Sequence, residues 1–444
     1  MNNEKTYASV FSLDGVPKFS EALPLALQHL VAMIVGCVTP AIIISGVAGL
    51  EGPDRVMLIQ ASLVVSALST FAQLFPVGKG NFRLGSGLPV IMGVSFAYLP
   101  SMQAIAGDFD IATILGAQLI GGIVAIIVGL FIDTIRKFFP PLIAGTVVFT
   151  IGLSLYPTAV TYMAGGGNPT TNPAFGSWQN WTVALFTLLV VVICNHFMKG
   201  FIKLASILIG MVSGYILALC LGMVNFSAVG TAGLFQLPIP LHFGIKFEIS
   251  SCVAIGLLFA INSIQAIGDF SATTSGGLDR QPTNQELKGG IVTYGITNMI
   301  GSVLGCLPTA TYSQNVGIVT TTKVVNRYIM GLAGVFILAA GLFPKFSALL
   351  TTIPQCVLGG ATISVFASIA MTGIKLVMTE DMNYRNTSIV GLAVALGMGV
   401  TQTGALSTFP AWVMTIFGKS PTVIATLVAI ILNIVLPRAA EKKA

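Results

Sequence analysis

The chain has 444 residues, of which 55% are hydrophobic and only 8% are charged, and its formal net charge is +6. A water-soluble domain carries roughly 25% charged residues because its surface must be hydrated, so this composition excludes a soluble globular protein. In so apolar a chain the basic excess indicates membrane topology and gives no reason to expect a nucleic-acid partner. We therefore expect a multi-pass membrane protein surrounded by lipid.

Apolar stretches separated by short charged segments run through the whole chain. A bilayer core about 30 Å thick is crossed by roughly 20 apolar helical residues, so they predict an all-α protein with about 14 crossing or partly crossing segments. In the first half these are Pro24–Val47, Val56–Phe75, Leu88–Ala106, Ile111–Ile132, Leu142–Leu155, Trp181–Phe197 and Leu204–Val224. In the second half they are Val253–Thr273, Gly290–Cys306, Thr309–Thr322, Tyr328–Phe343, Val357–Met371, Ser388–Val400 and Val423–Leu436.

Lysine and arginine orient these segments, because cytoplasmic loops of membrane proteins are enriched in both residues. With the N-terminus placed inside, only Arg55, Lys246, Lys345 and Lys419 of the 21 basic residues fall on the outer side. The sequence therefore predicts a cell-membrane protein with two cytoplasmic tails, residues 1–23 and 438–444. The polar N-terminal tail gives no indication of a cleavable signal peptide.

A short pattern recurs between the two halves and predicts an internal repeat. Pro140–Gly145, with the sequence PPLIAG, resembles Pro354–Gly359, with the sequence PQCVLG. Because each half holds an odd number of predicted segments, about seven, the two repeats would have opposite orientations in the membrane.

A second recurring pattern predicts that the third and tenth segments are broken helices. In each, a proline leads through a few strand-favouring residues to a serine, from Pro89 to Ser95 and from Pro308 to Ser313. Serine is a good helix N-cap, so we expect half-helices to start at Ser95 and Ser313, after short strands that pair with each other. Paired interrupted segments near the bilayer midplane typically form a transporter's binding site. The alternative is that both are ordinary Pro/Gly kinks.

Asp269 is the one acidic residue that falls deep inside a predicted segment. An ionisable residue at this depth is by default a functional hypothesis, and because burial disfavours the charged form, Asp269 would bind and release a proton. Gln265 lies one helical turn before it on the same face. Its amide can both donate and accept hydrogen bonds to a planar heterocycle. The alternatives are a structural hydrogen bond for Asp269 and a satisfied buried histidine for His29, in the first segment.

The sequence gives no reason to expect a metal or a cofactor. The six cysteines are scattered along the chain without a CxxC pair, which indicates small buried residues rather than disulfides or metal ligands. One Asp and one His on distant segments make neither a metal site nor a cluster of catalytic groups. We therefore expect a protein that is not an enzyme.

The stretch Gln314–Thr322, with the sequence QNVGIVTTT, matches a Gln or Glu followed by N-x-G-x-x-x-x-T and lies in the second predicted broken helix. On this motif the chain resembles the nucleobase-ascorbate transporter family. The resemblance extends over most of the chain and includes Leu27–Leu30 (LQHL), Gly85–Pro89 (GSGLP) and Gly268–Asp269.

The resemblance implies a homodimer in which a core domain carries the substrate past a gate domain by an elevator-like displacement. The core would comprise residues 24–132, holding spans 1–4, and residues 251–345, holding spans 8–11. The gate would comprise residues 133–250, holding spans 5–7, and residues 346–437, holding spans 12–14.

The resemblance also implies roles for single residues. Gln314 would hydrogen-bond the base, Phe96 would stack on it, and the backbone at Ser313 and Phe96 would contact it. Ser95 and Gln265 complete this expected site. Asn315 also belongs to the expected substrate-binding set, where it would support the site. His29, Gly317 and Thr322 would be supporting residues. Thr322 would influence selectivity or domain movement.

Gln at the first motif position resembles the xanthine and uric acid branch of the family, whereas Glu resembles the uracil branch. Two positions depart from the family: Gln265 stands where a Glu is usual, and Tyr294 stands where relatives of the xanthine branch carry Asp. Asp269 is left as the only deep carboxyl, so we expect it to couple transport to protons. The expected function is proton-coupled import of a purine: xanthine, uric acid, hypoxanthine, guanine or adenine.

Two other functions stay open at this point. One is a uracil permease of the same family. The other is an anion transporter of the same architecture, which would bind its anion at the N-termini of the half-helices. The pair Gln314 and Asn315, and the lack of a cationic residue near the breaks, disfavour the anion transporter. Sodium in place of the proton also stays open, although the sequence contains no carboxylate cluster to hold a cation.

Overall fold

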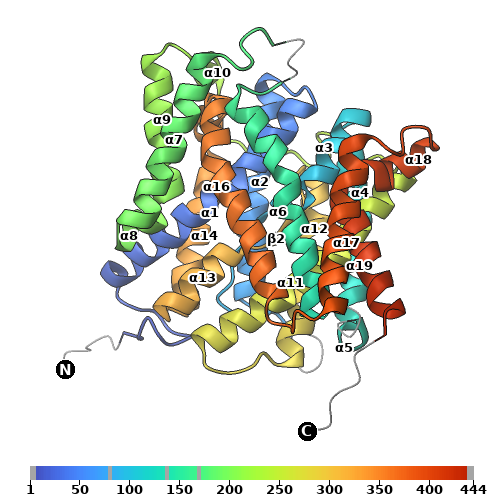
Figure 1. Ribbon diagram of the computed structural model, residues 1–444. Coiled ribbons are helices and arrows are strands. Elements are labelled where there is room, and N and C mark those ends of the chain that lie inside the picture. Colours follow the sequence, from blue (N-terminus) through green and yellow to red (C-terminus); the bar gives the residue numbers. More distant parts are fainter. Residues whose placement is uncertain (1–6, 79–82, 136–139, 168–171, 438–444) are drawn as a thin grey trace, which may run out of the picture.

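The computed structural model describes residues 7–78, 83–135, 140–167 and 172–437. Within these ranges the chain is a bundle of helices around a small two-stranded sheet (Figure 1). The predicted C-terminal tail, residues 438–444, and the first six residues of the predicted N-terminal tail lie outside the described residues.

The main elements follow a similar order in the two halves, with two long helices, a short strand and then further helices. The first half contains α1 Phe19–Val47, α2 Gly52–Leu74, β1 Met92–Val94, η1 Phe96–Tyr98, α3 Leu99–Asp108, α4 Ile111–Leu130, α5 Ile132–Ile135, α6 Pro141–Met163, α7 Trp178–Phe197, α8 Gly200–Leu204, α9 Ser206–Cys220 and α10 Ser227–Thr231. The second half contains α11 Ile249–Gly277, α12 Asn284–Val303, β2 Thr309–Thr311, α13 Ser313–Thr322, α14 Arg327–Leu342, α15 Pro344–Thr351, α16 Gln355–Val377, α17 Tyr384–Thr403, α18 Ala411–Val413, η3 Met414–Gly418 and α19 Pro421–Val435. The third and tenth predicted segments are strands followed by half-helices, which confirms both broken helices.

Several helices are longer than predicted. The fifth predicted segment ended at Leu155, but α6 continues through Pro157 to Met163. The twelfth ended at Met371, but α16 continues to Val377. Proline does not end α6 because packed neighbouring helices and local adjustments tolerate the lost backbone hydrogen bond in membrane helices.

Among the described residues, seven helices are long and apolar enough to cross a membrane: α1, α2, α4, α6, α7, α11 and α16. The pair α14 and α15, bent by 80°, would add an eighth. Helices α9 and α19 are apolar but shorter, while α12 and α17 each have 20 residues and are more polar. A total of about 14 crossings therefore stays a prediction.

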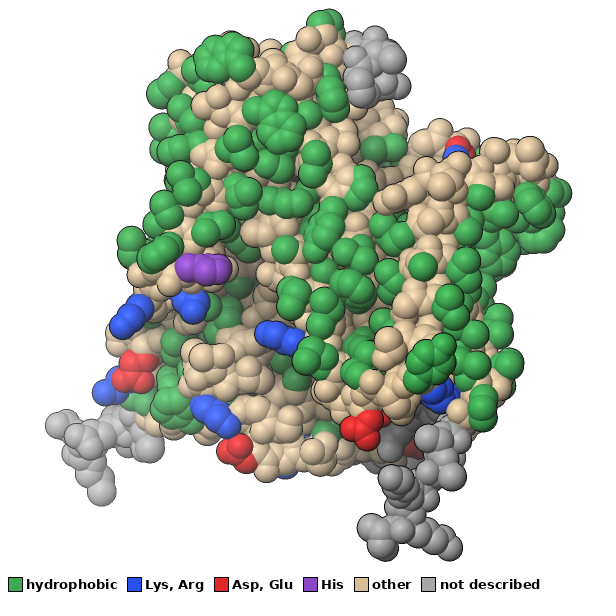
Figure 2. Space-filling view, in the orientation of Figure 1, with side chains coloured by type: hydrophobic (Ala, Val, Ile, Leu, Met, Phe, Trp, Pro, Cys, Tyr) green, Lys and Arg blue, Asp and Glu red, His purple; other side chains and the backbone are tan. Residues whose placement is uncertain are grey.

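The surface fits a protein that sits in lipid. Apolar side chains are spread over the face shown in Figure 2, and the Lys, Arg, Asp and Glu side chains in view gather mainly toward one end. The first and last described residues lie at that same end (Figure 1).

Equivalent helices of the two halves pack in equivalent ways. Helix α2 packs on α14 as α12 packs on α4, α7 packs on α9 as α17 packs on α19, and α6 packs on its own counterpart α16. At the last contact, a Cβ on Gly145 would lie 2.8 Å from the carbonyl oxygen of Gly373, so the two backbones approach too closely for a larger residue. This exchange symmetry is consistent with an inverted repeat.

The two strands are antiparallel, with Met92 opposite Thr311 and Val94 opposite Thr309, which confirms the predicted pairing. Flanking helices satisfy their outer edges. Thr70 of α2 accepts a hydrogen bond from the N–H of Met92 at 3.0 Å. On the other edge, Asn298 of α12 accepts from the N–H of Thr309 at 2.8 Å and donates to its carbonyl at 3.2 Å. Backbone groups inside a bilayer need such partners because lipid supplies none.

Thr70→Val should lower the free energy of unfolding by about 1–3 kcal/mol, because it leaves the buried N–H of Met92 unpaired. Thr146→Val is the matched control: Thr146 is equally buried, but its hydroxyl only donates to the Leu142 carbonyl of its own helix, at 2.7 Å. Denaturant unfolding of the two variants in detergent measures the difference. Equal destabilisation would contradict the role of Thr70 at the strand edge.

Candidate functional site

A cavity of about 230 Å³ lies where the two broken segments meet α6, α11 and α16. It is lined by Ser95, Phe96, Ala97, Val148, Ile151, Gln265, Thr311, Tyr312, Ser313, Gln314, Ser368, Ile369 and Thr372. All predicted substrate-binding residues except Asn315 are in this set. The volume is below the roughly 300–1,000 Å³ of sites for drug-sized ligands, so the cavity suits a smaller molecule.

Ser95 and Phe96 form one side of the cavity. The Ser95 hydroxyl accepts a hydrogen bond from the N–H of Ala97 at 3.2 Å and caps the turn η1. The Phe96 ring is mostly buried and meets Phe366 of α16 edge to face, with ring centroids 5.1 Å apart. Phe96 therefore borders the cavity with one part of its surface and packs against α16 with another.

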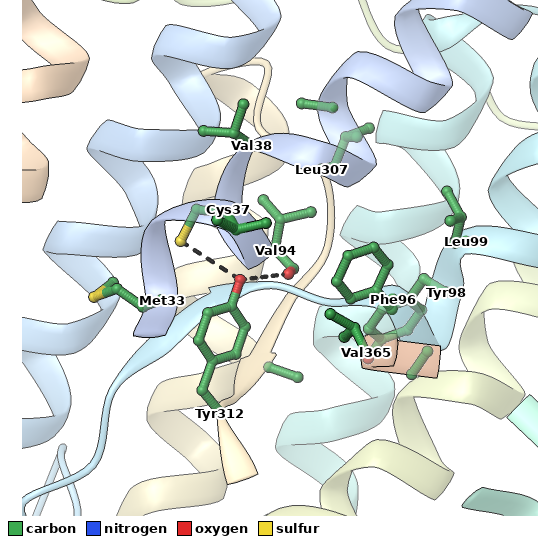
Figure 3. Packing of buried hydrophobic residues seen from close by; sticks show 14 of the residues in the cluster. Met33, Cys37, Val38, Val94, Phe96, Tyr98, Leu99, Leu307, Tyr312 and Val365 are labelled. Carbon is green, nitrogen blue, oxygen red and sulfur yellow. Dashed lines mark hydrogen bonds between the residues drawn. The ribbon is translucent and has the colours of Figure 1, made fainter. Parts of the chain in front are cut away.

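The second broken segment is joined to the first by Tyr312. Its hydroxyl donates to the Val94 carbonyl at 2.7 Å, beside Cys37 (Figure 3). Its N–H donates to the Ile91 carbonyl at 3.0 Å. These bonds extend the contact between the segments beyond the three-residue strands, so the start of α13 is fixed relative to β1.

Ser313 differs from the prediction. Helix α13 does begin at Ser313, but its N-cap is Tyr312, which makes no side-chain cap. The Ser313 hydroxyl instead donates to Asp269 Oδ1 at 2.8 Å. A hydroxyl that faces a buried carboxylate gains a charge-assisted hydrogen bond, which is stronger than a neutral cap.

Gln265 and Gln314 supply two amides to the cavity. Gln265 comes from α11 and is half-buried, while Gln314 comes from the first turn of α13 and is exposed. Neither side chain makes a hydrogen bond to another of the described residues. Both amides are therefore free to donate to a ligand and to accept from it.

Asp269 lies behind the cavity wall. Its carboxylate accepts hydrogen bonds from the hydroxyls of Thr311 and Ser313, and both donors line the cavity. The acid thus joins α11 to the junction of β2 and α13. It reaches the cavity only through these two hydroxyls.

The remaining predicted residues do not line the cavity. Asn315 donates to the Nδ1 atom and the backbone carbonyl of His29, both at 3.1 Å, so the two buried residues join α13 to α1. Thr322 donates to the Ile318 carbonyl within its own helix, and Gly317 is exposed. In this structure these residues support the fold around the site without contacting the space inside it.

The sequence-based prediction missed the wall opposite the broken segments. That wall consists of Val148 and Ile151 of α6 and Ser368, Ile369 and Thr372 of α16. Ser364, Ser368 and Thr372 recur every fourth residue in an otherwise apolar segment, and this polar stripe was a usable signal.

None of the described residues that line the cavity has a charged side chain. Within the described part of the chain, no three His, Cys, Asp or Glu residues are grouped closely enough to hold a metal ion. The chemistry available in the cavity is therefore hydrogen bonding by neutral groups and contact with aromatic residues.

Comparison with known proteins identifies the lineage of the chain. Residues 20–406 match the model of the permease family. The chain is 31% identical to the xanthine permease XanQ of Escherichia coli strain K12 over 442 residues, covering 96% of this chain and 94% of that protein. It is 33% identical to the uric acid permease PucJ of Bacillus subtilis strain 168 over 416 residues, covering 92% and 91%.

Solved structures share the fold at low identity. The transmembrane domain of the cyanobacterial bicarbonate transporter BicA gives a TM-score of 0.58 at 17% identity, covering 92% of this chain and 97% of that chain. The structure of SLC26A9 gives 0.63 at 10% identity, covering 94% and 65%. These likenesses establish a shared membrane-transporter architecture.

Asp269→Asn should keep nearly the full stability of the wild type, because an amide can accept from one hydroxyl and donate to the other. Asp269→Leu should lose about 1–3 kcal/mol, since Thr311 and Ser313 lose their acceptor. Denaturant unfolding in detergent compares the two variants. A leucine variant as stable as the asparagine variant would show that these bonds do not hold α11 to the broken segment.

Proposed function

The chain belongs to the nucleobase-ascorbate transporter family, and from this premise we propose that it imports a purine nucleobase together with a proton across the cell membrane. The family consists of transporters, so the chain is not an enzyme. Relatives over nearly its whole length are named for xanthine and for uric acid. Both are oxidised purines, which supports a purine as the substrate.

The observation that carries the proposal is the meeting of two free amides and one aromatic ring in a neutral cavity. Gln265, Gln314 and Phe96 come from three different elements and line the same space. The edge of an oxidised purine alternates N–H donors with carbonyl acceptors, and an amide matches this alternation because it offers both. The flat face of the base would stack on Phe96.

The alternatives are less well supported. An anion transporter is disfavoured by the absence of any cationic side chain from the cavity lining; the bicarbonate transporter shares the fold alone. A uracil permease is disfavoured by Gln314, because a Glu at this position would resemble the uracil branch. The names of the relatives, which refer to xanthine and uric acid, also disfavour it. Xanthine and uric acid are the preferred candidates, and hypoxanthine, guanine and adenine are further purines to test.

The position of the cavity supports an elevator-like mechanism. On one side it is lined by η1, α11, β2 and α13, which belong to the proposed core, residues 24–132 and 251–345. On the other side it is lined by α6 and α16, which belong to the proposed gate, residues 133–250 and 346–437. Movement of the core along the gate would carry a bound base between the two faces of the membrane. A homodimer with cytoplasmic termini completes this proposal.

Asp269 is the proposed site of proton coupling. A charged carboxylate near the bilayer centre is costly, so the core would move with its cargo most readily when this carboxyl is protonated. Thr311 and Ser313 link the acid to the cavity. A base that contacts these hydroxyls would change their hydrogen bonds to Asp269, and so couple its own binding to that of the proton.

Xanthine or another purine should stabilise the purified protein against heat, while uracil should not. Gln314→Leu should weaken purine affinity about tenfold or more, because leucine cannot form hydrogen bonds and the polar edge of the bound base is left unpaired. Gln402→Leu is the control, since Gln402 is exposed near the end of α17 and away from the cavity lining. Thermal-shift titration in detergent measures all three proteins. Stabilisation by uracil or by inorganic anions alone would contradict a purine substrate.

Asp269→Asn should abolish purine accumulation driven by a pH gradient, because an amide cannot take up the proton, and should keep purine binding. Uptake into proteoliposomes with an imposed pH gradient measures accumulation, and Asp279→Asn, at an exposed residue paired with Lys323, is the control. Undiminished uphill uptake by Asp269→Asn would contradict the assignment. Accumulation by the wild type that follows a sodium gradient instead would contradict proton coupling.

A further inference from the structure

Helix α12 places two side chains, one helical turn apart, against the two broken segments. The hydroxyl of Tyr294 is hydrogen-bonded to the hydroxyl of Tyr98, in the turn that opens the first half-helix. Asn298 holds the backbone of Thr309 in the second segment, and it also donates to the Tyr294 carbonyl at 2.9 Å. A single helix therefore contacts both halves of the cavity.

We propose that Tyr294 is a positioning residue for the substrate site, which holds Ser95 and Phe96 in place through Tyr98. This inference rests on the proposed function. Tyr98 is 0% exposed and Tyr294 is 1% exposed, and neither lines the cavity. Any effect of Tyr294 on a ligand must therefore be transmitted by the segment it holds.

The turn η1 is the path of that transmission. Phe96 and Tyr98 belong to this one turn of three residues (Figure 3), so a shift of the backbone at Tyr98 also shifts the backbone that carries Phe96. A peptide unit is rigid, and a turn this short has few dihedral angles that could absorb a shift. Loss of the hydrogen bond at Tyr98 would therefore reach the ring that borders the cavity.

Aromatic packing holds Tyr98 and Tyr294 with their hydroxyls together. Phe259 of α11 lies 4.9 Å from the ring of Tyr98 and 5.4 Å from the ring of Tyr294, with which it is stacked. On its other side the turn meets Phe366 through Phe96. A phenylalanine at position 294 would keep the ring contact with Phe259 and remove its hydroxyl from the pair, which makes Tyr294→Phe a clean substitution.

The second half of the site is held by hydrogen bonds that do not involve the side chain of Tyr294. Gln314 follows Tyr312 and Ser313, which bond to Val94 and Asp269. The strand before them is held by Asn298. Tyr294 should therefore influence the contribution of Phe96 to binding and leave the contribution of Gln314 unchanged.

Isothermal titration of xanthine into the detergent-purified protein tests whether the Tyr98–Tyr294 pair affects substrate affinity. Tyr294→Phe and Tyr98→Phe should each weaken xanthine binding about three- to tenfold, the size of one lost hydrogen bond. The double variant should be no weaker than either single variant, because both remove the same interaction. Tyr215→Phe is the matched control. Tyr215 lies in α9, and its hydroxyl is hydrogen-bonded to the hydroxyl of Thr352, after α15, at 2.7 Å. Neither residue lines the cavity, so xanthine affinity should not change.

A second cycle separates positioning from mere stability. Tyr294→Phe should weaken binding by less than about twofold in a Phe96→Leu background, and by its full factor in a Gln314→Leu background. A Tyr294→Phe variant that melts earlier but binds xanthine normally would overturn the inference, and so would an equal loss in both backgrounds. Failure of the wild type to bind any purine would refute the proposed function, and this inference with it. The failure of this inference and the failure of the proposed function are distinguishable, because only the failure of the proposed function appears in the wild type.

Discussion

Extended backbone inside a bilayer has no water to bind, and this constraint organises the centre of the molecule. Two three-residue strands can satisfy only the groups that face each other. The groups on the outer edges need side chains from outside the sheet, and Thr70 and Asn298 provide them. The buried polar residue Asn298 of α12 is therefore explained by the strand beside it. The cavity exists because this sheet holds the start of both half-helices in one place.

The two broken segments have similar sequences but make different hydrogen bonds. Ser95 caps its own helix turn, so its hydroxyl is bonded within the first segment. In the second segment the N-cap residue, Tyr312, makes no side-chain cap, and the hydroxyl of Ser313 donates to Asp269. One half of the site therefore presents a fixed aromatic ring. The other half is joined to a buried acid, Asp269, which is the proposed site of proton coupling. This division gives the proposed coupling a physical basis, because the group that is charged lies next to the segment that carries Gln314.

Local signals in the sequence predicted the parts of the site that depend on local chemistry. Both breaks were identified from a proline followed by strand-favouring residues and a serine. Asp269 was identified because it is an acidic residue inside an apolar stretch. Contacts between distant segments could not be found in this way. Ser368 and Thr372 enter the cavity because α16 packs across it, and Ser313 prefers Asp269 over capping because α11 brings a carboxylate near. Tyr294 was visible only as the loss of a carboxyl, since its partner Tyr98 lies in the other half of the chain. Helix ends were missed for the same reason: α6 passes Pro157 because its neighbours support it.

The central claim is that both broken segments and α11 together enclose one flat, neutral base. A cryo-electron microscopy map of the protein in nanodiscs, determined with xanthine, tests this most directly. Density for the base should lie against the ring of Phe96 and within hydrogen-bond distance of the amides of Gln265 and Gln314. Density for xanthine at another place in the protein, or continuous helices through residues 92–98 and 309–313, would contradict it.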